Sequence, residues 1–256
     1  MNVVRSTLAL AALTACASAP AARAAAPTAA EILQLADHAA SDYADLSFES
    51  KMKIFEPGAA APAKEISFIT SIKGDKRLIR FLSPADLKGM GMLIESRDVM
   101  YAFLPGFNRI RRLGTHMKSQ TLFGSDVSNE ETSSNTYAAV YTPRLVGEEG
   151  PSWVLELTLN PGKEAEFPKL KMWVDKANHY ATKIESFDAA GKGAMTQTRL
   201  NFTKDFGDTQ HYTPATVTFV DHRRNDHRTE IWNANAKANQ KLSDDLFSQR
   251  NLARGN

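Results

Sequence analysis

The chain has 256 residues, of which 43% are hydrophobic, and its formal net charge is +2. It is therefore long enough to bury a hydrophobic core. Residues 1–24 contain two arginines and no acidic residue, so the remainder carries 29 basic and 29 acidic residues, and this balance argues against generic binding to nucleic acid.

Residues 1–24 have the composition of an export signal. A basic n-region and a short apolar stretch precede the sequence Ala-Arg-Ala at 22–24, which is a typical cleavage site. We therefore expect a signal peptide over 1–24 and an exported, periplasmic domain over 25–256. A second interpretation stays open, because the sequence Leu-Thr-Ala-Cys fits a lipobox, and the protein would then be a lipoprotein anchored through Cys16. Cys16 is the only cysteine, so residues 25–256 can contain neither a disulfide nor a cysteine-based site.

The domain is predicted to open with an amphipathic helix. Thr28 and Glu31 fit a capping box, and apolar residues follow at helical spacing from Ile32 to Tyr43. The apolar stripe of such a helix has to pack against another element. Since almost everything that follows has strand character, we expect the helix to lie against a sheet.

Alternating apolar residues predict a long series of strands after this helix. Side chains on one face of a strand recur at every second residue. In the first half of the chain, this alternation assigns to an inward face the residues Phe48, Met52, Ile54, Ile66, Phe68, Ile72, Ile79, Phe81, Met90, Met92 and Ile94. In the second half, predicted strands cover 153–159, 170–174, 180–187, 195–202, 214–220 and 228–232. A short closing helix is expected near 243–249.

The predicted fold is mainly β, of the α+β class. About ten or more strands at short spacing indicate a sequential antiparallel meander. Such a sheet either closes into a barrel or stays open and strongly curved around a helical element. The alanine-rich stripe of the opening helix favours the second arrangement, which is a single curved antiparallel sheet in the form of a half-barrel, with helices covering the concave face.

The segment 100–113 is predicted to be a hairpin with a basic second arm. Tyr101 and Phe103 alternate in an apolar run, a proline-glycine pair marks the turn, and three arginines follow. Beyond it, the polar segment 114–134 is longer than an ordinary connection in a compact domain. Loops of that length are usually functional or disordered.

These motifs resemble the LolA-like family of outer-membrane lipoprotein-sorting proteins. The matching segments are Tyr101–Pro105, Asn108–Arg112, Phe123–Asp126 with Glu130, and Leu246–Ser248 with Leu252. The sequence departs from the family at Val127, where an aromatic residue is usual, and at Asn129, where tyrosine is usual. The resemblance implies a half-barrel with a helical lid and an apolar cavity that receives acyl chains. It also implies, for this subgroup, an association with transporters of the resistance-nodulation-division (RND) type.

The resemblance and the alternation together point to an apolar lipid-binding cavity. Its expected lining residues are Phe48, Met52, Phe68, Phe81, Met90, Met92, Tyr101, Phe103, Leu155 and Leu157. Thioether and aromatic side chains suit such a cavity because they adapt to irregular guests. The alternative interpretation is that the same residues only fill a hydrophobic core.

Three arginines and one aspartate are the candidates for contacts at the mouth of this cavity. Alternation sends Arg109 and Arg111 to one face of their strand and Arg112 to the other. In one interpretation, one of them binds an anionic lipid head group or pairs with Asp126 to hold the loop over the cavity. In the other, they form a solvated strand face with ordinary surface ion pairs.

Other kinds of site are disfavoured by the sequence. Ser125 lies outside any G-x-S-x-G elbow and has no identifiable histidine partner, which argues against a hydrolase. The histidines lack metal-ligand spacing, although His222 and His227 flank a predicted turn across which they could approach each other. No glycine-rich phosphate loop is present. We therefore expect neither a metal nor a cofactor.

The function that these observations favour is that of a non-enzymatic, monomeric periplasmic carrier. It would bind the acyl chains of a lipid or lipoprotein and move them toward the outer membrane, with an RND-type transporter as partner and without nucleic acid. The alternative is an adaptor or sensor subunit of an envelope transporter or stress pathway, built on the same fold.

Overall fold

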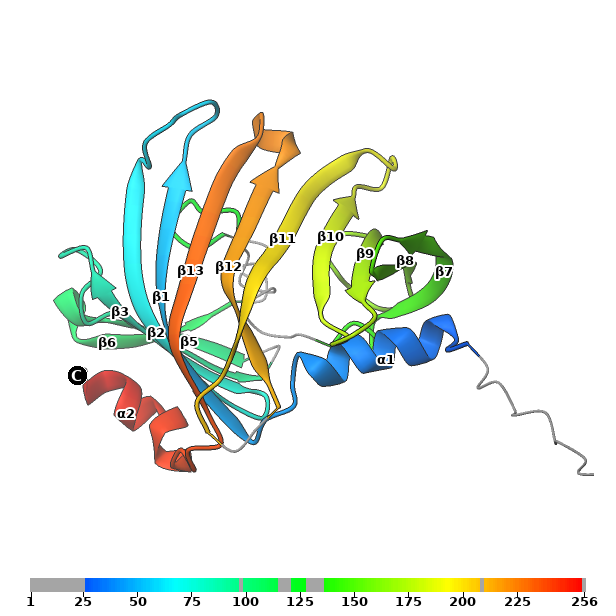
Figure 1. Ribbon diagram of the computed structural model, residues 1–256. Helices are drawn as coiled ribbons and strands as arrows, with labels where there is room; N and C mark the ends of the chain where they lie inside the picture. Colours follow the sequence, from blue (N-terminus) through cyan, green and yellow to red (C-terminus); the bar gives the residue numbers. More distant parts are fainter. Residues whose placement is uncertain (1–25, 97–98, 115–120, 128–135, 208–209, 255–256) are drawn as a thin grey trace, which may run out of the picture.

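Thirteen strands form one antiparallel sheet in the part of the chain that the computed structural model describes (Figure 1). That part comprises residues 26–96, 99–114, 121–127, 136–207 and 210–254. The predicted signal peptide, the possible lipidation site Cys16 and the motif positions Asn129 and Glu130 lie outside the described residues.

The strands follow one another along the chain. Their bounds are β1 Asp45–Phe55, β2 Lys64–Lys73, β3 Lys76–Ser83, β4 Gly91–Ser96, β5 Val99–Leu104, β6 Arg109–Leu113, β7 Tyr141–Glu149, β8 Ser152–Leu159, β9 Lys169–Asp175, β10 Ala181–Phe187, β11 Gly193–Lys204, β12 Tyr212–Asp221 and β13 His227–Ala238. The order across the sheet is β6-β5-β4-β3-β2-β1-β13-β12-β11-β10-β9-β8-β7. The first and last strands therefore pair in the middle of the sheet, and β6 and β7 are its edges. The predicted antiparallel meander is confirmed, and the sheet is open.

Strand β7 is not predicted by the sequence pattern. It contains Pro143 and is exposed over most of its length, with Tyr141 as its buried residue. It pairs with β8 and forms an edge of the sheet. Edge strands tolerate proline and need no alternating apolar face, so the usual signal of a strand is weak here.

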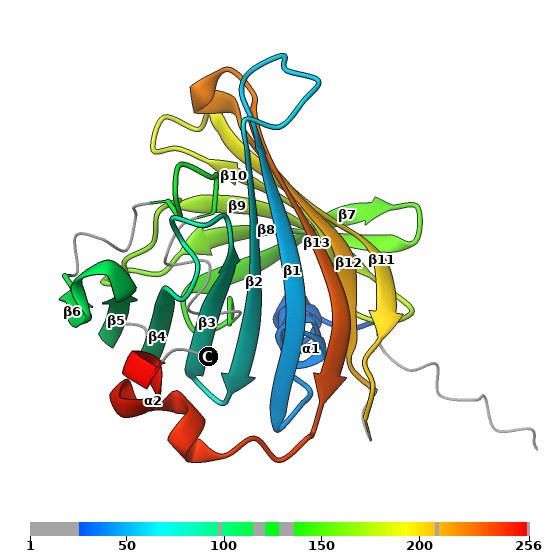
Figure 2. The ribbon, with the colours of Figure 1, turned by 90° about the vertical axis from the view of Figure 1, so that its left-hand side faces the viewer.

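One face of the sheet, here called the inner face, carries the main hydrophobic core. Met52 in β1, Phe81 in β3, Met92 in β4 and Leu155 in β8 are buried in one continuous cluster on this face. Figure 2 shows how the sheet curves. Full burial of a side chain of this size stabilises the fold by about 1.5–3 kcal/mol, so the alternating pattern of the sequence fixes which face of each strand points inward.

The opposite face, here called the outer face, carries a second and smaller cluster. Phe103 and Leu93 lie in it with Phe247 and Leu252 from the C-terminal segment, and Tyr101 packs against them. The sequence-based assignment of Tyr101 and Phe103 to the inward face is therefore wrong. Strand β5 is apolar at nearly every position because both of its faces are covered, and alternation cannot then decide which residues point inward.

Helix α1 (Ala29–Ala39) begins at the predicted capping box. The backbone N–H of Thr28 donates to Glu31 Oε2 at 2.7 Å, and the backbone N–H of Glu31 donates to Thr28 Oγ1 at 3.3 Å. Its buried side chains Ile32, Leu33 and Ala36 belong to the inner-face cluster. The helix packs against β7 and β8, which confirms the expectation that it lies against the sheet.

Helix α2 (Gln249–Arg254) follows a 3₁₀ turn (Asp244–Phe247) and lies against β4, β5 and β6. Arg80 in β3 donates from Nη1 to the carbonyl oxygen of Leu252 at 2.9 Å and from Nη2 to that of Asn251. Because α2 belongs to the outer-face cluster (Figure 2), the expectation that the helices cover the concave face is not confirmed.

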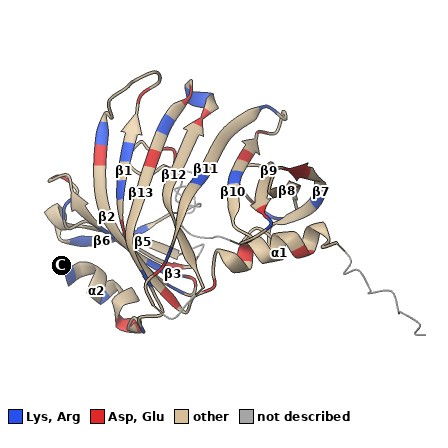
Figure 3. Ribbon diagram, in the orientation of Figure 1, with Lys and Arg blue, Asp and Glu red and all other residues tan. Residues whose placement is uncertain are grey.

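Charged residues of both signs are interspersed along β1, β2 and β13 (Figure 3). Lys51 Nζ lies 2.8 Å from Glu65 Oε2, and Arg228 Nε lies 3.0 Å from Glu230 Oε1. Exposed pairs such as that of Lys51 and Glu65 contribute at most about 1 kcal/mol each. They therefore say more about solubility than about stability or binding.

Candidate functional site: a pocket on the inner face

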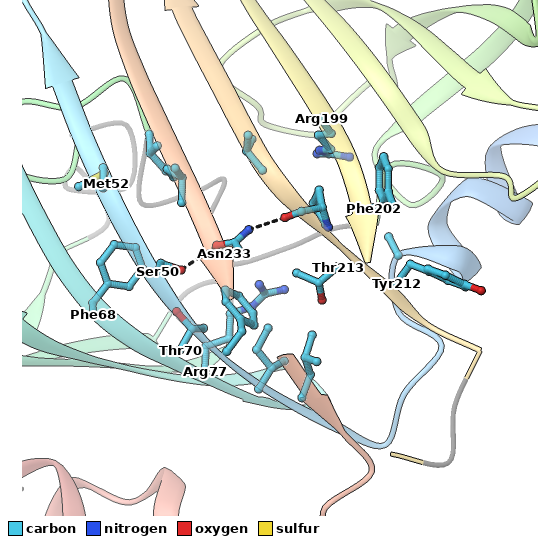
Figure 4. A pocket seen from close by; sticks show the side chains of 18 of the residues that line it. Ser50, Met52, Phe68, Thr70, Arg77, Arg199, Phe202, Tyr212, Thr213 and Asn233 are labelled. Atoms are coloured by element: carbon cyan, nitrogen blue, oxygen red, sulfur yellow. Dashed lines mark hydrogen bonds between the residues drawn. The ribbon is translucent and has the colours of Figure 1, made fainter. Parts of the chain in front are cut away.

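A pocket of about 240 Å³ is hollowed into the inner face of the sheet (Figure 4). Its walls come from β1, β2, β3, β11, β12 and β13, from the end of α1 and from the short described segment 121–127. The pocket therefore lies where β1 pairs with β13, and it draws on residues from both halves of the chain.

One part of the pocket is apolar. The residues that line this part are Met52, Phe68, Ile79, Leu122, Val127, Val217, Phe219 and Ile231. The strand residues among them occupy alternate positions that face the core. In β2, for example, Phe68 lines the pocket, and Ile66, two residues earlier on the same face, is buried in the core cluster. An apolar wall with conformationally adaptable methionine and aromatic side chains suits a hydrocarbon ligand.

The rest of the pocket wall, here called its polar part, mixes polar side chains with apolar ones such as Leu46, Phe48 and Ile72. Ser50 Oγ donates to Asn233 Oδ1 at 2.8 Å, and Asn233 Nδ2 donates to the carbonyl oxygen of Pro214 at 2.9 Å, which fixes the amide (Figure 4). Thr70 and Arg77 line the same part of the pocket. These side chains occupy inward positions on neighbouring strands, where apolar residues would otherwise complete the core.

Arg77 is the most unusual of these residues. Its Nε is buried and has no hydrogen-bond partner among the described residues. Burial lowers the pKa of the Arg77 guanidinium, although the nearby Tyr43 and Asp75 act in the opposite direction. An arginine still remains protonated in any protein environment, so Arg77 brings a positive charge into a largely apolar pocket.

A buried acid–imidazole pair supports the rim of the pocket. His211 Nδ1 lies 2.6 Å from Asp205 Oδ2, while Asp205 Oδ1 accepts the backbone N–H of Thr213 at 3.0 Å. The ring of Tyr43 meets the His211 ring edge-on at 4.8 Å between centroids. These contacts hold the start of β12 and place Thr213 in the pocket wall.

The predicted cavity residues fall into three groups. Phe48, Met52 and Phe68 line the pocket. The residues that share its core cluster without lining it are Phe81, Met90, Met92, Leu155 and Leu157. Tyr101 and Phe103 are on the outer face. The structure thus brings three of the ten predicted residues to the pocket.

The predicted head-group arginines do not lie at the pocket. Arg109, Arg111 and Arg112 are exposed on the edge strand β6. In the pairing of β6 with β5, they lie opposite Leu104, Ala102 and Tyr101, respectively. The hypothesis that one of them pairs with Asp126 is wrong, because a different arginine occupies that place.

Asp126 is fully buried and is held by three partners from the β12–β13 region. Its carboxylate accepts from Thr229 Oγ1 at 2.7 Å and from Arg224 Nη1 at 3.0 Å, and His227 Nδ1 lies 2.7 Å from its Oδ1. Burial raises the pKa of Asp126 above its ordinary value, and the hydrogen bonds from Thr229 and His227 and the charge of Arg224 oppose only part of this rise. Asp126 thus fixes its loop, as predicted, but its partners are residues about 100 positions later in the chain.

This network positions part of the pocket wall. Leu122 and Val127, on either side of Asp126, both line the pocket. The backbone N–H of Leu122 donates to the carbonyl oxygen of Val127 at 2.9 Å, which closes a compact turn. Val127, where the LolA-like pattern has an aromatic residue, therefore supplies an aliphatic contact to the cavity.

The two histidines that flank the turn at 223–226 have separate partners. His222 Nδ1 lies 2.6 Å from Asp226 Oδ1, whereas His227 is paired with Asp126. In the described part of the chain, no three metal-ligating side chains come together. Nor does any described helix have the length and apolar character needed to cross a membrane.

Sequence reasoning missed the polar residues of the pocket, among them Ser50, Thr70, Arg77, Arg199, Thr213 and Asn233. One signal was available for Arg77. It precedes Ile79 and Phe81 at every second position, so alternation itself points a charged side chain inward. A charge at an inward position of a strand usually marks a functional residue or a buried ion pair.

Comparison with known proteins places the fold. A family model described as "uncharacterized protein" matches residues 73–254. No curated protein sequence is significantly similar to the chain.

Three solved structures share the architecture over 88% of this chain. They are a DUF1329 family protein from Desulfovibrio piger (24% identity, 97% of that chain, TM-score 0.78), an outer-membrane lipoprotein-sorting protein domain from Vibrio parahaemolyticus (22%, 98%, 0.76) and a LolA superfamily protein from Nitrosomonas europaea (22%, 100%, 0.71). The resemblance found in the sequence motifs is thereby confirmed. The chain belongs to the family that this model describes, and its fold is that of the LolA-like outer-membrane lipoprotein-sorting proteins.

Proposed function

We propose that the protein is a periplasmic carrier, which binds an acyl chain of a lipid or lipoprotein in the inner-face pocket and moves it toward the outer membrane. The observation that carries this proposal is the apolar part of the pocket, built from Met52, Phe68, Val217 and their neighbours on a LolA-like sheet. The carrier performs no covalent step. Its export would be directed by residues 1–24, and it would work as a monomer.

The driving force would be burial of hydrocarbon. Each methylene group transferred from water contributes about 0.8 kcal/mol. Six to eight buried methylenes would therefore supply about 5–6 kcal/mol before the cost of ordering the ligand. Binding of this strength protects an acyl chain in transit and still permits its release to a membrane or a partner protein.

The resemblance supports an inner-membrane transporter of the RND type as the partner that loads or unloads the carrier. The exposed basic edge strand β6, with Arg109, Arg111 and Arg112, is available for such a contact. We therefore assign these three arginines to protein or membrane contacts and not to the pocket.

Native mass spectrometry of the exported protein, purified from the periplasm without detergent, tests the proposal. We expect a discrete added mass that organic extraction identifies as an acylated molecule. Val217→Trp fills the apolar part of the pocket and should abolish the added mass. Leu200→Trp introduces the same side chain at an exposed position of β11 and should leave it unchanged. A ligand-free mass with no uptake of added lipid would contradict the carrier function.

A further inference from the structure

Two buried polar atoms without partners belong to residues that line the same pocket. In the described part of the chain, three buried side-chain nitrogen or oxygen atoms lack a hydrogen bond: Arg77 Nε, Thr213 Oγ1 and Arg228 Nε. Arg228 Nε lies 3.0 Å from Glu230 Oε1 and thus has a charged neighbour. The other two both belong to residues that line the pocket. Because a buried polar atom without a partner is costly, folded proteins retain few of them, and each needs an explanation.

The pocket also carries positive charge that its own lining does not neutralise. Arg77 and Arg199 both line it, and among the described residues no lining residue is acidic. Arg199 Nη2 donates to the neutral amide oxygen of Gln197 at 3.3 Å. The nearby carboxylate of Asp205 is already engaged by His211 and by the backbone N–H of Thr213. Of the described carboxylates, only Asp75, which does not line the pocket, acts on Arg77, so a ligand with a negative charge would find cations that the described lining does not pair.

We propose that the polar part of the pocket, around Arg77, binds the anionic head group of a single-chain amphiphile. The head group is a carboxylate or phosphate, and the tail occupies the apolar part around Met52 and Val217. The proposal rests on the carrier function and specifies its ligand. A volume of about 240 Å³ lies just below the range of about 300–1,000 Å³ typical of small-molecule sites. A single chain fits such a volume better than a bulky multi-chain lipid does.

The geometry assigns the contacts. The guanidinium of Arg77 can donate from its two Nη groups to the two oxygens of one carboxylate or phosphate. Thr213 of β12 and Thr70 of β2 lie in the same part of the pocket (Figure 4), and rotation of the Thr213 hydroxyl toward the ligand adds a further donor. The hydrogen bonds from Ser50 to Asn233 and from Asn233 to Pro214 keep the amide in a fixed orientation beside them.

A comparison of three ligands with the same dodecyl chain tests the head-group preference. Dodecanoate, 1-dodecanol and dodecylamine are titrated into delipidated protein by isothermal titration calorimetry. We expect dodecanoate to bind about tenfold to a hundredfold more tightly than 1-dodecanol, the range expected for hydrogen bonds to a charged group. Dodecylamine should bind most weakly, because it places a cation beside Arg77.

Substitutions show which residues cause the preference for dodecanoate over 1-dodecanol. Arg77→Met should abolish the advantage of dodecanoate while leaving the affinity for 1-dodecanol within about twofold. Arg77→Lys should keep part of the advantage, and Thr213→Val should reduce it. Arg144→Met removes an exposed arginine of β7 that pairs with Glu156, and it should change nothing. Thermal unfolding is measured for each protein; if Arg77→Met does not fold, Arg77→Lys and Thr213→Val carry the test.

The outcomes separate this inference from the carrier function. Equal affinities for dodecanoate and 1-dodecanol, or an advantage that survives in Arg77→Met, would overturn the head-group assignment and leave the carrier function standing. Failure of all three ligands to bind would overturn both. Dodecyl phosphate and inorganic phosphate are compared last: binding of inorganic phosphate as tightly as dodecyl phosphate would show a site for the free anion and overturn the amphiphile.

Discussion

The imidazole Nδ1 of His227 lies 2.7 Å from Oδ1 of Asp126, although the two residues are 101 positions apart. Both side chains are almost completely buried. The contact joins the loop after β6 to the start of β13, and Leu122 and Val127 of that loop line the pocket. The position of one pocket wall thus depends on a polar network outside the pocket.

Asp126→Asn should weaken this wall. The amide places an NH₂ group where Asp126 now accepts from Thr229, His227 and Arg224, so at least one of these donors loses its acceptor. We expect the free energy of unfolding in urea to fall by about 1–3 kcal/mol. Dissociation of bound dodecanoate should become faster, because the loop no longer holds the tail.

The control for this variant is Asp226→Asn, in the turn next to the network. Asp226 is exposed and pairs with His222 at 2.6 Å. An exposed pair contributes at most about 1 kcal/mol, and Asp226 does not line the pocket. Equal stability and equal ligand dissociation in the two variants would show that the Asp126 network does not position the wall.

Acid should remove a stabilising contribution from Asp221. Burial alone would raise the pKa of this carboxyl group, but the hydrogen bonds and charge of Arg223 bring the pKa below its usual value. The unfolded state then binds protons more readily than the folded state, so stability is complete above about pH 4 and falls as the pH drops through the folded pKa. Urea unfolding between pH 6 and pH 2.5 should show a shallower acid loss in Asp221→Asn. An unchanged slope would refute the assignment.

The sequence predicts the fold best where strands are half-buried. In β1 and β2, one face meets the core and the other meets water, so alternation identifies Met52 and Phe68 correctly. The pattern fails at β5, which is covered on both faces, and at β7, which is an exposed edge. Helix α1 was predictable because its capping box is a local signal.

The pocket was harder to predict than the sheet. Its polar part depends on the pairing of β1 with β13, and the hydrogen bond from Ser50 to Asn233 joins residues 183 positions apart. Likewise, Asp126 finds its partners in residues that local motifs do not connect to it. Local patterns predict which face of a strand a side chain occupies, whereas these contacts arise only when strands far apart in the sequence pair, as β1 does with β13.

Gly91 is expected to be irreplaceable for close packing of α2. A β-carbon at this position would lie 2.7 Å from Leu252 Cδ1, so Leu252 would have to move. We expect Gly91→Ala to lower the free energy of unfolding by about 1–3 kcal/mol, as for other overpacked sites. Hydrogen exchange of the α2 amides should become faster. Gly193→Ala is the control, because a β-carbon there meets no atom within 4 Å; equal effects of the two substitutions would contradict the packing argument.

Substitutions on the two faces of the sheet should differ in their effect on ligand binding, although both lower stability. Phe103 is 5% exposed in the outer-face cluster, and Phe68 is 8% exposed on the pocket wall. Phe103→Ala should cost about 3–5 kcal/mol of stability through the cavity that it creates, while the affinity for dodecanoate stays unchanged. Phe68→Ala opens space that is continuous with the pocket, so it should lower affinity as well as stability. If Phe103→Ala folded and yet lost ligand while Phe68→Ala retained it, the acyl chain would bind on the outer face, and the assignment of the pocket would have to be reversed.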